Sequence, residues 1–190
     1  MTEQIAPIDP GFRLVGRALT VDAGPADNLM LHAALEQARP GDVLVADARG
    51  FLQAGAWGDV LTVAAQKVGV AGLVIDGAVR DAAQIIELGF PVFARGLCIR
   101  GTSKTYRGSV GAPVSIAGTP VRTGDVIVGD RDGLVVIAQD EVAASLAAAE
   151  AREAKEDEFR RQIEQGAFTT ELLGLTDTLE QFNLRTLPAS

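Results

Sequence analysis

The chain has 190 residues, 47% of them hydrophobic and 22% charged, enough for one compact domain with a sizeable core and an appended element. Its formal net charge of −8, without any cluster of Lys and Arg, argues against a nucleic-acid or anionic-membrane surface. The N-terminus lacks the features of a signal peptide, Cys98 is the single cysteine, and no apolar run is long enough to cross a bilayer. We therefore expect a cytoplasmic protein.

Residues 27–96 alternate between predicted helices and strands. The first helix is expected after Asp27, which would cap it, and should stop at Pro40 and Gly41. The elements that follow are a strand at 42–47, a helix at 58–69, a strand at 70–77, a helix at 80–89 and a strand at 91–96. This βαβαβ run predicts an α/β fold.

The chain changes character after this run. Residues 109–138 hold only short β-segments joined by glycine-containing turns, which predicts hairpins packed beside the mixed part. The segments PGDVLVAD at 40–47 and TGDVIVGD at 123–130 resemble each other. We interpret them as one way of turning into a strand that the chain uses twice, because a single short match does not establish a repeat.

A long helix rich in alanine and charge is predicted over 140–166, supported by pairs such as Glu156 with Arg160. Its apolar stripe is too thin for burial against its own domain, so we expect it to lie across a neighbouring subunit. The predicted organisation is therefore an α/β domain over residues 1–145 and a C-terminal helical extension over 146–190.

Two helix starts are candidate ligand sites, because ligands of open α/β sheets bind beyond the carboxyl ends of the strands. At the first, AGAWGDVL, the free N–H groups after Gly58 could hold a small anion, although a plain turn with an N-cap explains the pattern too. Neighbouring Trp57 could line a pocket or belong to a rim or interface. At the second, DGAVRDAA, Asp81 could be only an N-cap and Arg80 a solvated neighbour.

The functional alternative at the second start is that Arg80 pairs with an anionic substrate group while Asp81 binds a divalent cation. With one cysteine and one histidine, the chain offers no zinc motif, so a metal would be held by oxygen. Twenty residues separate Asp59 from Arg80, the length of one helix and one strand, which should bring both helix starts to the same sheet edge. This spacing favours the functional interpretation.

These residues carry a resemblance to a known family. The segment GDVLTVAAQKVGVAGLVIDGAVRD, followed by GFPVFARG and preceded by DNLMLHAALEQARPGDVLV, resembles the RraA-like family, over roughly residues 12–138. That family includes 4-hydroxy-4-methyl-2-oxoglutarate/4-carboxy-4-hydroxy-2-oxoadipate aldolases and protein regulators of ribonuclease activity. The resemblance implies a swivelling β/β/α fold, assembly as a homotrimer or a dimer of trimers, and an active site between subunits.

The resemblance also implies residue roles. Asp81 would ligate Mg²⁺ or Mn²⁺, Arg80 would contact the pyruvyl part of the substrate, and Asp59 would hold metal-bound water. The turn that would bind the substrate carboxylate consists of Gly58, Asp59, Val60 and Leu61. A C-terminal glutamate from the adjacent subunit would complete the site, and both Glu153 and Glu156 are candidates, with helix position slightly favouring Glu156.

The expected reaction is a metal-dependent retro-aldol cleavage of a 4-hydroxy-2-oxo di- or tricarboxylic acid to pyruvate and a second oxo product. Oxaloacetate decarboxylation passes through the same enolate and is an expected side activity. A Schiff-base mechanism is disfavoured, because Lys67, Lys104 and Lys155 do not follow strand ends. Two alternatives stay open: a non-catalytic regulator that binds a ribonuclease, and a paralogue acting on an unrelated acid.

Overall fold

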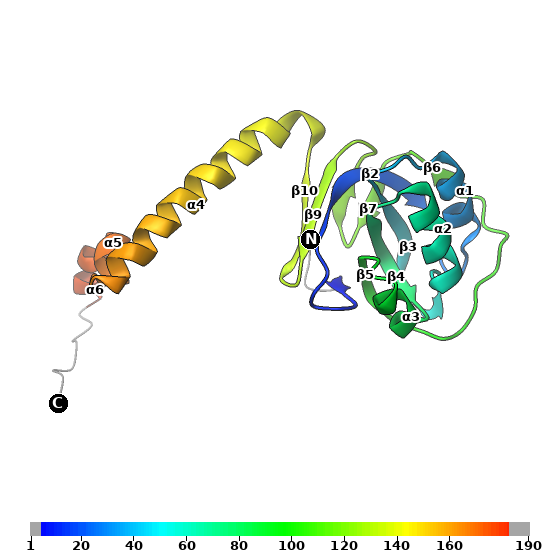
Figure 1. The fold of residues 1–190 in the computed structure, drawn as a ribbon, viewed down its shortest axis with the longest axis horizontal. Coiled ribbons are helices and arrows are strands. Elements are labelled where there is room, and N and C mark those ends of the chain that lie inside the picture. The colour runs from blue at the N-terminus through cyan, green and yellow to red at the C-terminus, as the bar shows by residue number, and fades with distance from the viewer. Residues whose placement is uncertain (1–4, 183–190) are drawn as a thin grey trace. The chain divides into compact units, whose positions relative to one another are not determined.

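The computed structural model describes residues 5–182, which form two compact units with their boundary between Val142 and Ala143 (Figure 1). The first unit contains every strand of this described part. Within residues 5–182 no helix is both long and apolar enough to cross a membrane.

The first unit is built on an eight-stranded mixed sheet. Its strand order is β1-β5-β4-β3-β2-β9-β10, with β6 pairing with β2. The strands are β1 (Ala6–Pro7), β2 (Leu14–Asp22), β3 (Asp42–Gly55), β4 (Gly72–Val79), β5 (Val92–Leu97), β6 (Ser109–Val110), β9 (Val126–Asp130) and β10 (Gly133–Ile137). Strands β2 to β5 are mutually parallel, whereas β1, β6, β9 and β10 pair antiparallel. The βαβαβ prediction and the α/β class are confirmed.

Helices α1 (Leu29–Gln37), α2 (Asp59–Val68) and α3 (Ala82–Glu87) lie on the same side of this sheet (Figure 1). They bury one apolar cluster, to which strand residues such as Leu44, Leu73 and Ile75 contribute. The alternate strand residues, such as Val43 and Val74, belong to a second cluster on the other face. Because side chains alternate along a strand, all eight residues of β4 are buried between these two clusters.

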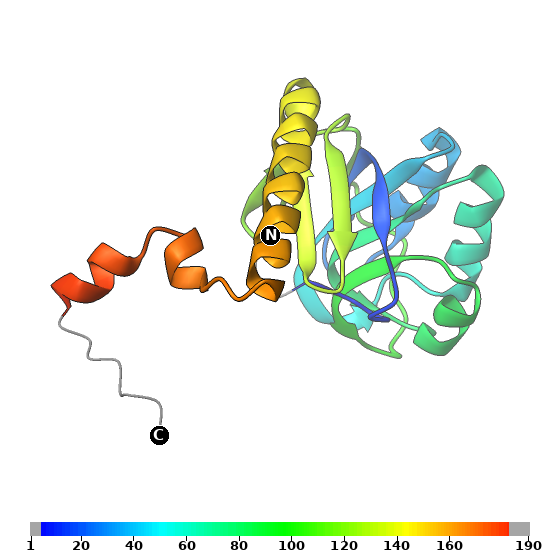
Figure 2. The same ribbon diagram turned by 60° about the vertical axis from the view of Figure 1, so that its left-hand side comes forward.

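The predicted β-only region forms two hairpins. Strands β7 (Val114–Ile116) and β8 (Thr119–Val121) make a separate two-stranded sheet, and β9 pairs with β10. Figure 2 shows the β9–β10 hairpin, in yellow-green, beside the blue β2. The hairpins therefore extend and cover the sheet that the βαβ units build.

The two similar segments noted in the sequence do share one turn. The Asp42 carboxylate accepts the N–H of Arg39 at 2.9 Å, and the Asp125 carboxylate accepts the N–H of Arg122 at 2.8 Å. Each turn leads into a strand that pairs with β2, parallel for β3 and antiparallel for β9. The interpretation of one local solution used twice is confirmed, without implying a duplicated domain.

Strand β3 is longer than predicted, since it reaches Gly55 instead of ending at residue 47. Its pairing with β4 is irregular around Phe51, where Arg49 and Gly50 adopt positive φ angles of 57° and 67°. Such conformations kink a strand without ending it. The extension carries β3 directly to the turn before α2.

The second unit consists of α4 (Val142–Glu164), α5 (Thr169–Leu172) and α6 (Thr176–Gln181), with α4 starting one residue before the boundary. No residue of α4 is buried, and ion pairs run along its surface, including the predicted Glu156–Arg160 pair at 3.6 Å. Alanine propensity and these pairs account for its helicity. Its contact with a neighbouring subunit stays a prediction, and residues 183–190 of the predicted extension lie outside the described chain.

Helix α1 begins at Leu29 with Asn28 as its N-cap, so the predicted cap at Asp27 is wrong by one residue. Asp27 still accepts the Leu29 N–H at 2.8 Å. Its other oxygen accepts the Ser103 hydroxyl and the N–H groups of residues 105–106. With only 1% of Asp27 exposed, this carboxylate fastens the loop after β5 to the start of α1.

We predict that Asp27 makes unfolding pH-dependent. Burial raises the pKa of this carboxyl, but the hydrogen bonds outweigh it and lower the pKa to about 2. Because the folded pKa lies below that of the unfolded chain, stabilisation of about 2 kcal/mol is present above pH ~4 and is lost as the pH falls towards 2. Urea denaturation should show that Asp27→Asn is less stable at pH 7 and that the difference shrinks below pH ~4.

The matched control is Asp132→Asn, which changes an exposed carboxylate in the β9–β10 turn. This variant should follow the wild type at every pH. A constant difference between wild type and Asp27→Asn from pH 7 to pH 2 would contradict the assignment.

Candidate functional site

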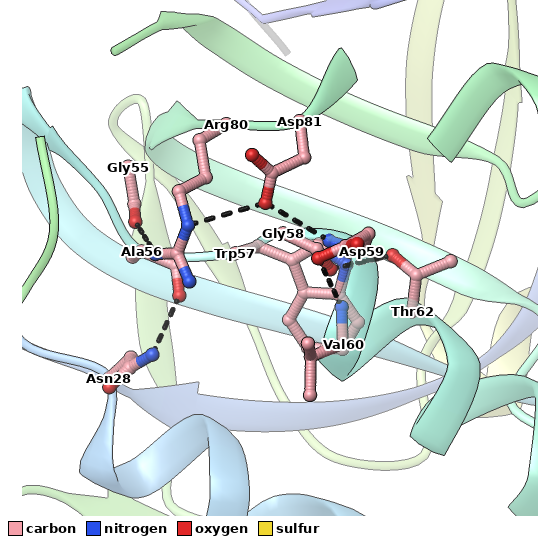
Figure 3. Close-up of polar contacts among 10 residues, drawn as sticks. All are labelled: Asn28, Gly55, Ala56, Trp57, Gly58, Asp59, Val60, Thr62, Arg80 and Asp81. Carbon is pink, nitrogen blue, oxygen red and sulfur yellow. Dashed lines mark hydrogen bonds and ion pairs between the residues drawn. The ribbon is translucent and has the colours of Figure 1, made fainter. Parts of the chain in front are cut away.

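The starts of α2 and α3 lie side by side at one edge of the sheet (Figure 3). Helix α2 follows β3 and α3 follows β4, and these strands are adjacent and parallel. Both helices therefore begin at the same edge of the sheet. Gly58 is the N-cap of α2 and Asp81 the N-cap of α3. The sequence spacing between Asp59 and Arg80 therefore brings these two segments together as predicted.

Asp81 does not use its carboxylate to cap α3. No side-chain capping bond is present, and the residue has a left-handed backbone with φ 57° and ψ 37°. Instead, Oδ2 lies 3.3 Å from Arg80 Nε and accepts a long 3.4 Å hydrogen bond from the Asp59 N–H (Figure 3). Oδ1 has no hydrogen bond or ion pair among residues 5–182. Asp81 therefore occupies the predicted N-cap position, but its carboxylate makes no capping bond and faces α2 with one oxygen free.

Arg80 is held on several sides instead of being a solvated neighbour. Its Nη1 donates to the Gly55 carbonyl at 2.8 Å, and its backbone N–H donates to the Trp57 carbonyl at 2.8 Å. Only 29% of its side chain is exposed. These bonds fix the guanidinium beside Asp81 while leaving Nη2 without a hydrogen-bond partner in the described chain.

The Asp59 side chain turns towards its own helix. Its Oδ1 accepts the Val60 N–H at 2.7 Å, and its backbone N–H points to Asp81. Two of the four predicted anion-binding amides are therefore engaged within the protein. The N–H groups of Gly58 and Leu61 have no hydrogen-bond partner within residues 5–182.

The backbone angle does not explain the glycine at position 58, because its φ of −154° is open to any residue. The close approach of the Asp81 and Arg80 side chains explains it. A Cβ there would lie 2.4 Å from Asp81 Oδ2 and 3.1 Å from Arg80 Nε. The glycine thus allows the Asp81 carboxylate to reach the first turn of α2.

Trp57 neither lines a pocket nor sits at a rim, so both predicted roles are wrong. It is fully buried and stacks on Phe90 with the ring centroids 6.1 Å apart and the ring planes inclined by 11°. The chain after β3 therefore runs through the core at Trp57 and Gly58, and it becomes partly exposed again at Asp59.

Asn28 is a neighbour of the site that sequence reasoning missed. It is 3% exposed, and its Nδ2 donates to the Ala56 carbonyl at 3.2 Å (Figure 3). Its Oδ1 is the single buried side-chain oxygen or nitrogen without a partner in the described part of the chain. The available signal was its position directly after Asp27, at a helix start that also follows a parallel strand.

A cavity of ≈ 370 Å³ lies beside Arg80 and Asp81. Its other lining residues are Ala82, Ala83, Gln84, Leu97, Cys98 and Ile99. A larger depression of ≈ 440 Å³ near Arg122 contains one buried carboxylate, Asp125, but the turn before β9 already uses it. The cavity at Arg80 is the better ligand site because its charged groups keep free hydrogen-bonding positions.

Residues 5–182 contain no group of three or more His, Cys, Asp or Glu side chains able to hold a metal. A closed protein cage is therefore absent from this part of the chain. Asp81 does suit a weaker open site, because its Oδ1 is free and 33% of its side chain is exposed. Mg²⁺ commonly takes one or two carboxylates and fills its remaining positions with water and substrate oxygens.

The predicted C-terminal glutamates belong to α4 in the second unit. Glu156 accepts the Arg152 Nε–H at 2.7 Å, and this hydrogen bond lowers the pKa of its carboxyl. Glu153 makes no side-chain hydrogen bond or ion pair within residues 5–182. The role of either glutamate at a neighbouring site stays a prediction.

We predict that Gly58→Ala destabilises the folded protein by about 1–3 kcal/mol, because the new methyl group must displace the Asp81 carboxylate. Asp81→Gly in the same background should recover much of that loss, since it removes the clash. Urea denaturation of both single variants and the double variant measures this coupling. Additive effects would show that the two residues do not touch.

Comparisons with known proteins identify the family of the chain. The model of the RraA-like family, described as Aldolase/RraA, matches residues 1–136. A protein of Halalkalibacterium halodurans named "Putative 4-hydroxy-4-methyl-2-oxoglutarate aldolase" is 39% identical over 163 residues, covering 86% of this chain and 78% of the relative.

Two solved structures have the same fold. An uncharacterized protein from Pseudomonas syringae is 32% identical, with a TM-score of 0.77 over 90% of this chain and 82% of its own. The RNA-processing inhibitor RraA from Thermus thermophilis is 28% identical, with a TM-score of 0.67 over 72% of this chain and 83% of its own. The chain therefore belongs to the RraA-like family.

Proposed function

We propose that the protein cleaves a 4-hydroxy-2-oxo acid to pyruvate and a second oxo product, in a reaction that depends on a divalent metal ion. The observation that carries this proposal is the meeting of Arg80 and the Asp81 carboxylate with the first turn of α2, where Arg80 and Asp81 also line a cavity. The name of the Halalkalibacterium relative supports aldolase chemistry in the family.

The anionic end of the substrate has two candidate binding groups. Arg80 Nη2 has no protein partner, and the start of α2 offers the N–H groups of Gly58 and Leu61 together with the positive end of the helix dipole. A guanidinium and backbone amides are both strong donors to a carboxylate. Arg80 would also stabilise the negative charge that develops on the enolate oxygen during cleavage.

Asp81 is the proposed metal ligand, through its free Oδ1. A bound Mg²⁺ or Mn²⁺ would act as a Lewis acid on the 2-oxo group. Asp81 keeps one oxygen available for such an ion, because Arg80 contacts only Oδ2.

Asp59 is the proposed route for the proton from the substrate's C4 hydroxyl. Removal of this proton, directly or through an oriented water, lets the C4 oxygen form a carbonyl as the C3–C4 bond breaks; the electron pair of that bond forms the C2=C3 double bond of an enolate, whose charge lies on the 2-oxo oxygen. Protonation at C3 then gives pyruvate. Asp59 keeps Oδ2 free for this task, since only Oδ1 accepts the Val60 N–H.

Assembly as a homotrimer or a dimer of trimers is part of the proposal. In such an assembly Glu153 or Glu156 of a neighbouring copy would complete the site. The lack of buried residues on α4 supports this, because an exposed 23-residue helix has a face available for a partner.

We predict that Asp81→Asn lowers metal-dependent pyruvate release on the order of 100-fold or more. Asparagine keeps the side-chain size and tolerates the left-handed backbone, so the loss reports on charge. The assay follows pyruvate from a panel of 4-hydroxy-2-oxo acids and oxaloacetate, with Mg²⁺, with Mn²⁺ and with a chelator. Undiminished turnover by Asp81→Asn would contradict the proposal that Asp81 is a metal ligand.

Asp132→Asn is the control here as well, because this exposed carboxylate lies in the β9–β10 turn. The same assay separates the enzyme from the second class of function in this family, which the RNA-processing inhibitor from Thermus represents. Binding to a ribonuclease that persists in chelator, together with no turnover of any oxo acid, would favour a regulator.

A further inference from the structure

A buried chain of hydrogen bonds runs beneath the proposed site. Trp57 Nε1 lies 2.8 Å from Thr62 Oγ1, and Thr62 Oγ1 lies 3.0 Å from the Gly58 carbonyl oxygen (Figure 3). Both Trp57 and Thr62 are 0% exposed. The same carbonyl also accepts the Thr62 N–H at 3.0 Å. Two groups of one core residue therefore hold the carbonyl at the N-cap of α2.

Chemistry fixes the direction of this chain. An indole N–H can only donate, so Thr62 Oγ1 must accept from Trp57. The threonine hydroxyl hydrogen is then left for the Gly58 carbonyl, which can only accept. Every polar group in this series of hydrogen bonds has a partner, as buried groups require, and each group has one possible orientation.

The Gly58 carbonyl belongs to the same peptide group as the Asp59 N–H. A trans peptide is planar, so its C=O and N–H point in opposite directions and turn together. When Thr62 holds the oxygen in the core, the Asp59 N–H must point out of the core. In the structure that N–H points to Asp81 Oδ2 at 3.4 Å.

The N-cap itself cannot supply this control. Gly58 has no side chain, and an added Cβ would collide with Asp81 Oδ2. The usual way to fix a helix start, a Ser, Thr, Asp or Asn cap, is therefore absent here. The Gly58 carbonyl is oriented by the N–H and the hydroxyl of Thr62, and stacking on Phe90 restrains the Trp57 ring that donates to this hydroxyl.

We propose that Trp57 and Thr62 are positioning residues, which aim the Asp59 N–H at Asp81 and so set the direction of the Asp81 carboxylate. This inference rests on the proposed function in assigning Asp81 a metal. Neither residue is expected to touch the substrate, because both lie in the core. Loss of the Thr62 hydroxyl would leave the Gly58 carbonyl held by the Thr62 N–H alone, which would loosen the peptide group and the Asp81 carboxylate.

The test compares three variants that differ in one hydroxyl group. Thr62→Val removes the hydroxyl at constant shape, and Thr62→Ser restores it. Thr20→Val is the matched control, because Thr20 is also 0% exposed and its Oγ1 bonds Thr123 Oγ1 at 2.6 Å, away from Asp81. All three are measured by thermal melting, residue-resolved amide hydrogen exchange without metal, and titration with Mn²⁺ alone.

For Thr62→Val we expect exchange of the Asp59 amide to rise about tenfold and the Kd for Mn²⁺ to rise about tenfold. Thr62→Ser should return both values close to wild type. Thr20→Val should lower the melting temperature without changing either value. If Thr62→Val melts like Thr20→Val and its Asp59 exchange is unchanged, the hydroxyl is structural only and the proposal is overturned.

The two proposals fail in different ways. If the wild type releases no pyruvate from any oxo acid, the proposed reaction is wrong, while amide exchange still decides the positioning role. If pyruvate release is present and depends on Asp81, but Thr62→Val leaves Asp59 exchange and Mn²⁺ binding at wild-type values, only the positioning role is wrong.

Discussion

The contact between the Asp81 carboxylate and the first turn of α2 is the constraint on which the site depends. A 3.4 Å hydrogen bond joins the two helix starts, and a 3.3 Å ion pair with neighbouring Arg80 holds the same carboxylate oxygen. Three conditions make it possible: glycine at 58, a left-handed backbone at Asp81, and an anchored guanidinium. These conditions belong to different residues, and the parallel pairing of β3 with β4 brings those residues together. The site therefore depends on the sheet register and not on any one residue.

The left-handed conformation of Asp81 costs roughly 1 kcal/mol relative to an ordinary backbone. Aspartate tolerates this conformation better than most residues, and here it directs the side chain across to α2 instead of over α3. The surrounding bonds from Arg80 to Gly55 and Trp57 hold the preceding residue in place. Local strain at a charged, partly exposed residue beside a cavity is what a preorganised site would show.

The sequence was sufficient for the βαβαβ run and for the approach of the segments at Asp59 and Arg80, because strand and helix lengths determine where a chain returns to a sheet edge. It did not predict β1 or the central strand β2. It was insufficient for side-chain direction. The Asp59 carboxylate binds its own helix start, Trp57 enters the core, and Asn28 joins the site from α1. These outcomes depend on backbone angles and on packing across the sheet, neither of which hydrophobic periodicity contains.

The exposure of apolar side chains at the cavity affects how strongly Arg80 and Asp81 attract charged ligands. Leu97 is 61% exposed and Ile99 93% exposed, so two apolar side chains beside Arg80 and Asp81 are open to water in the single chain. Water weakens the attraction between a carboxylate and a cation, and excluding it strengthens that attraction. Covering these two residues, by a substrate or by the neighbouring copy of the proposed assembly, would bury apolar surface and lower the local dielectric constant together. Binding and charge stabilisation would then be coupled, and the open single chain would hold a metal weakly by itself.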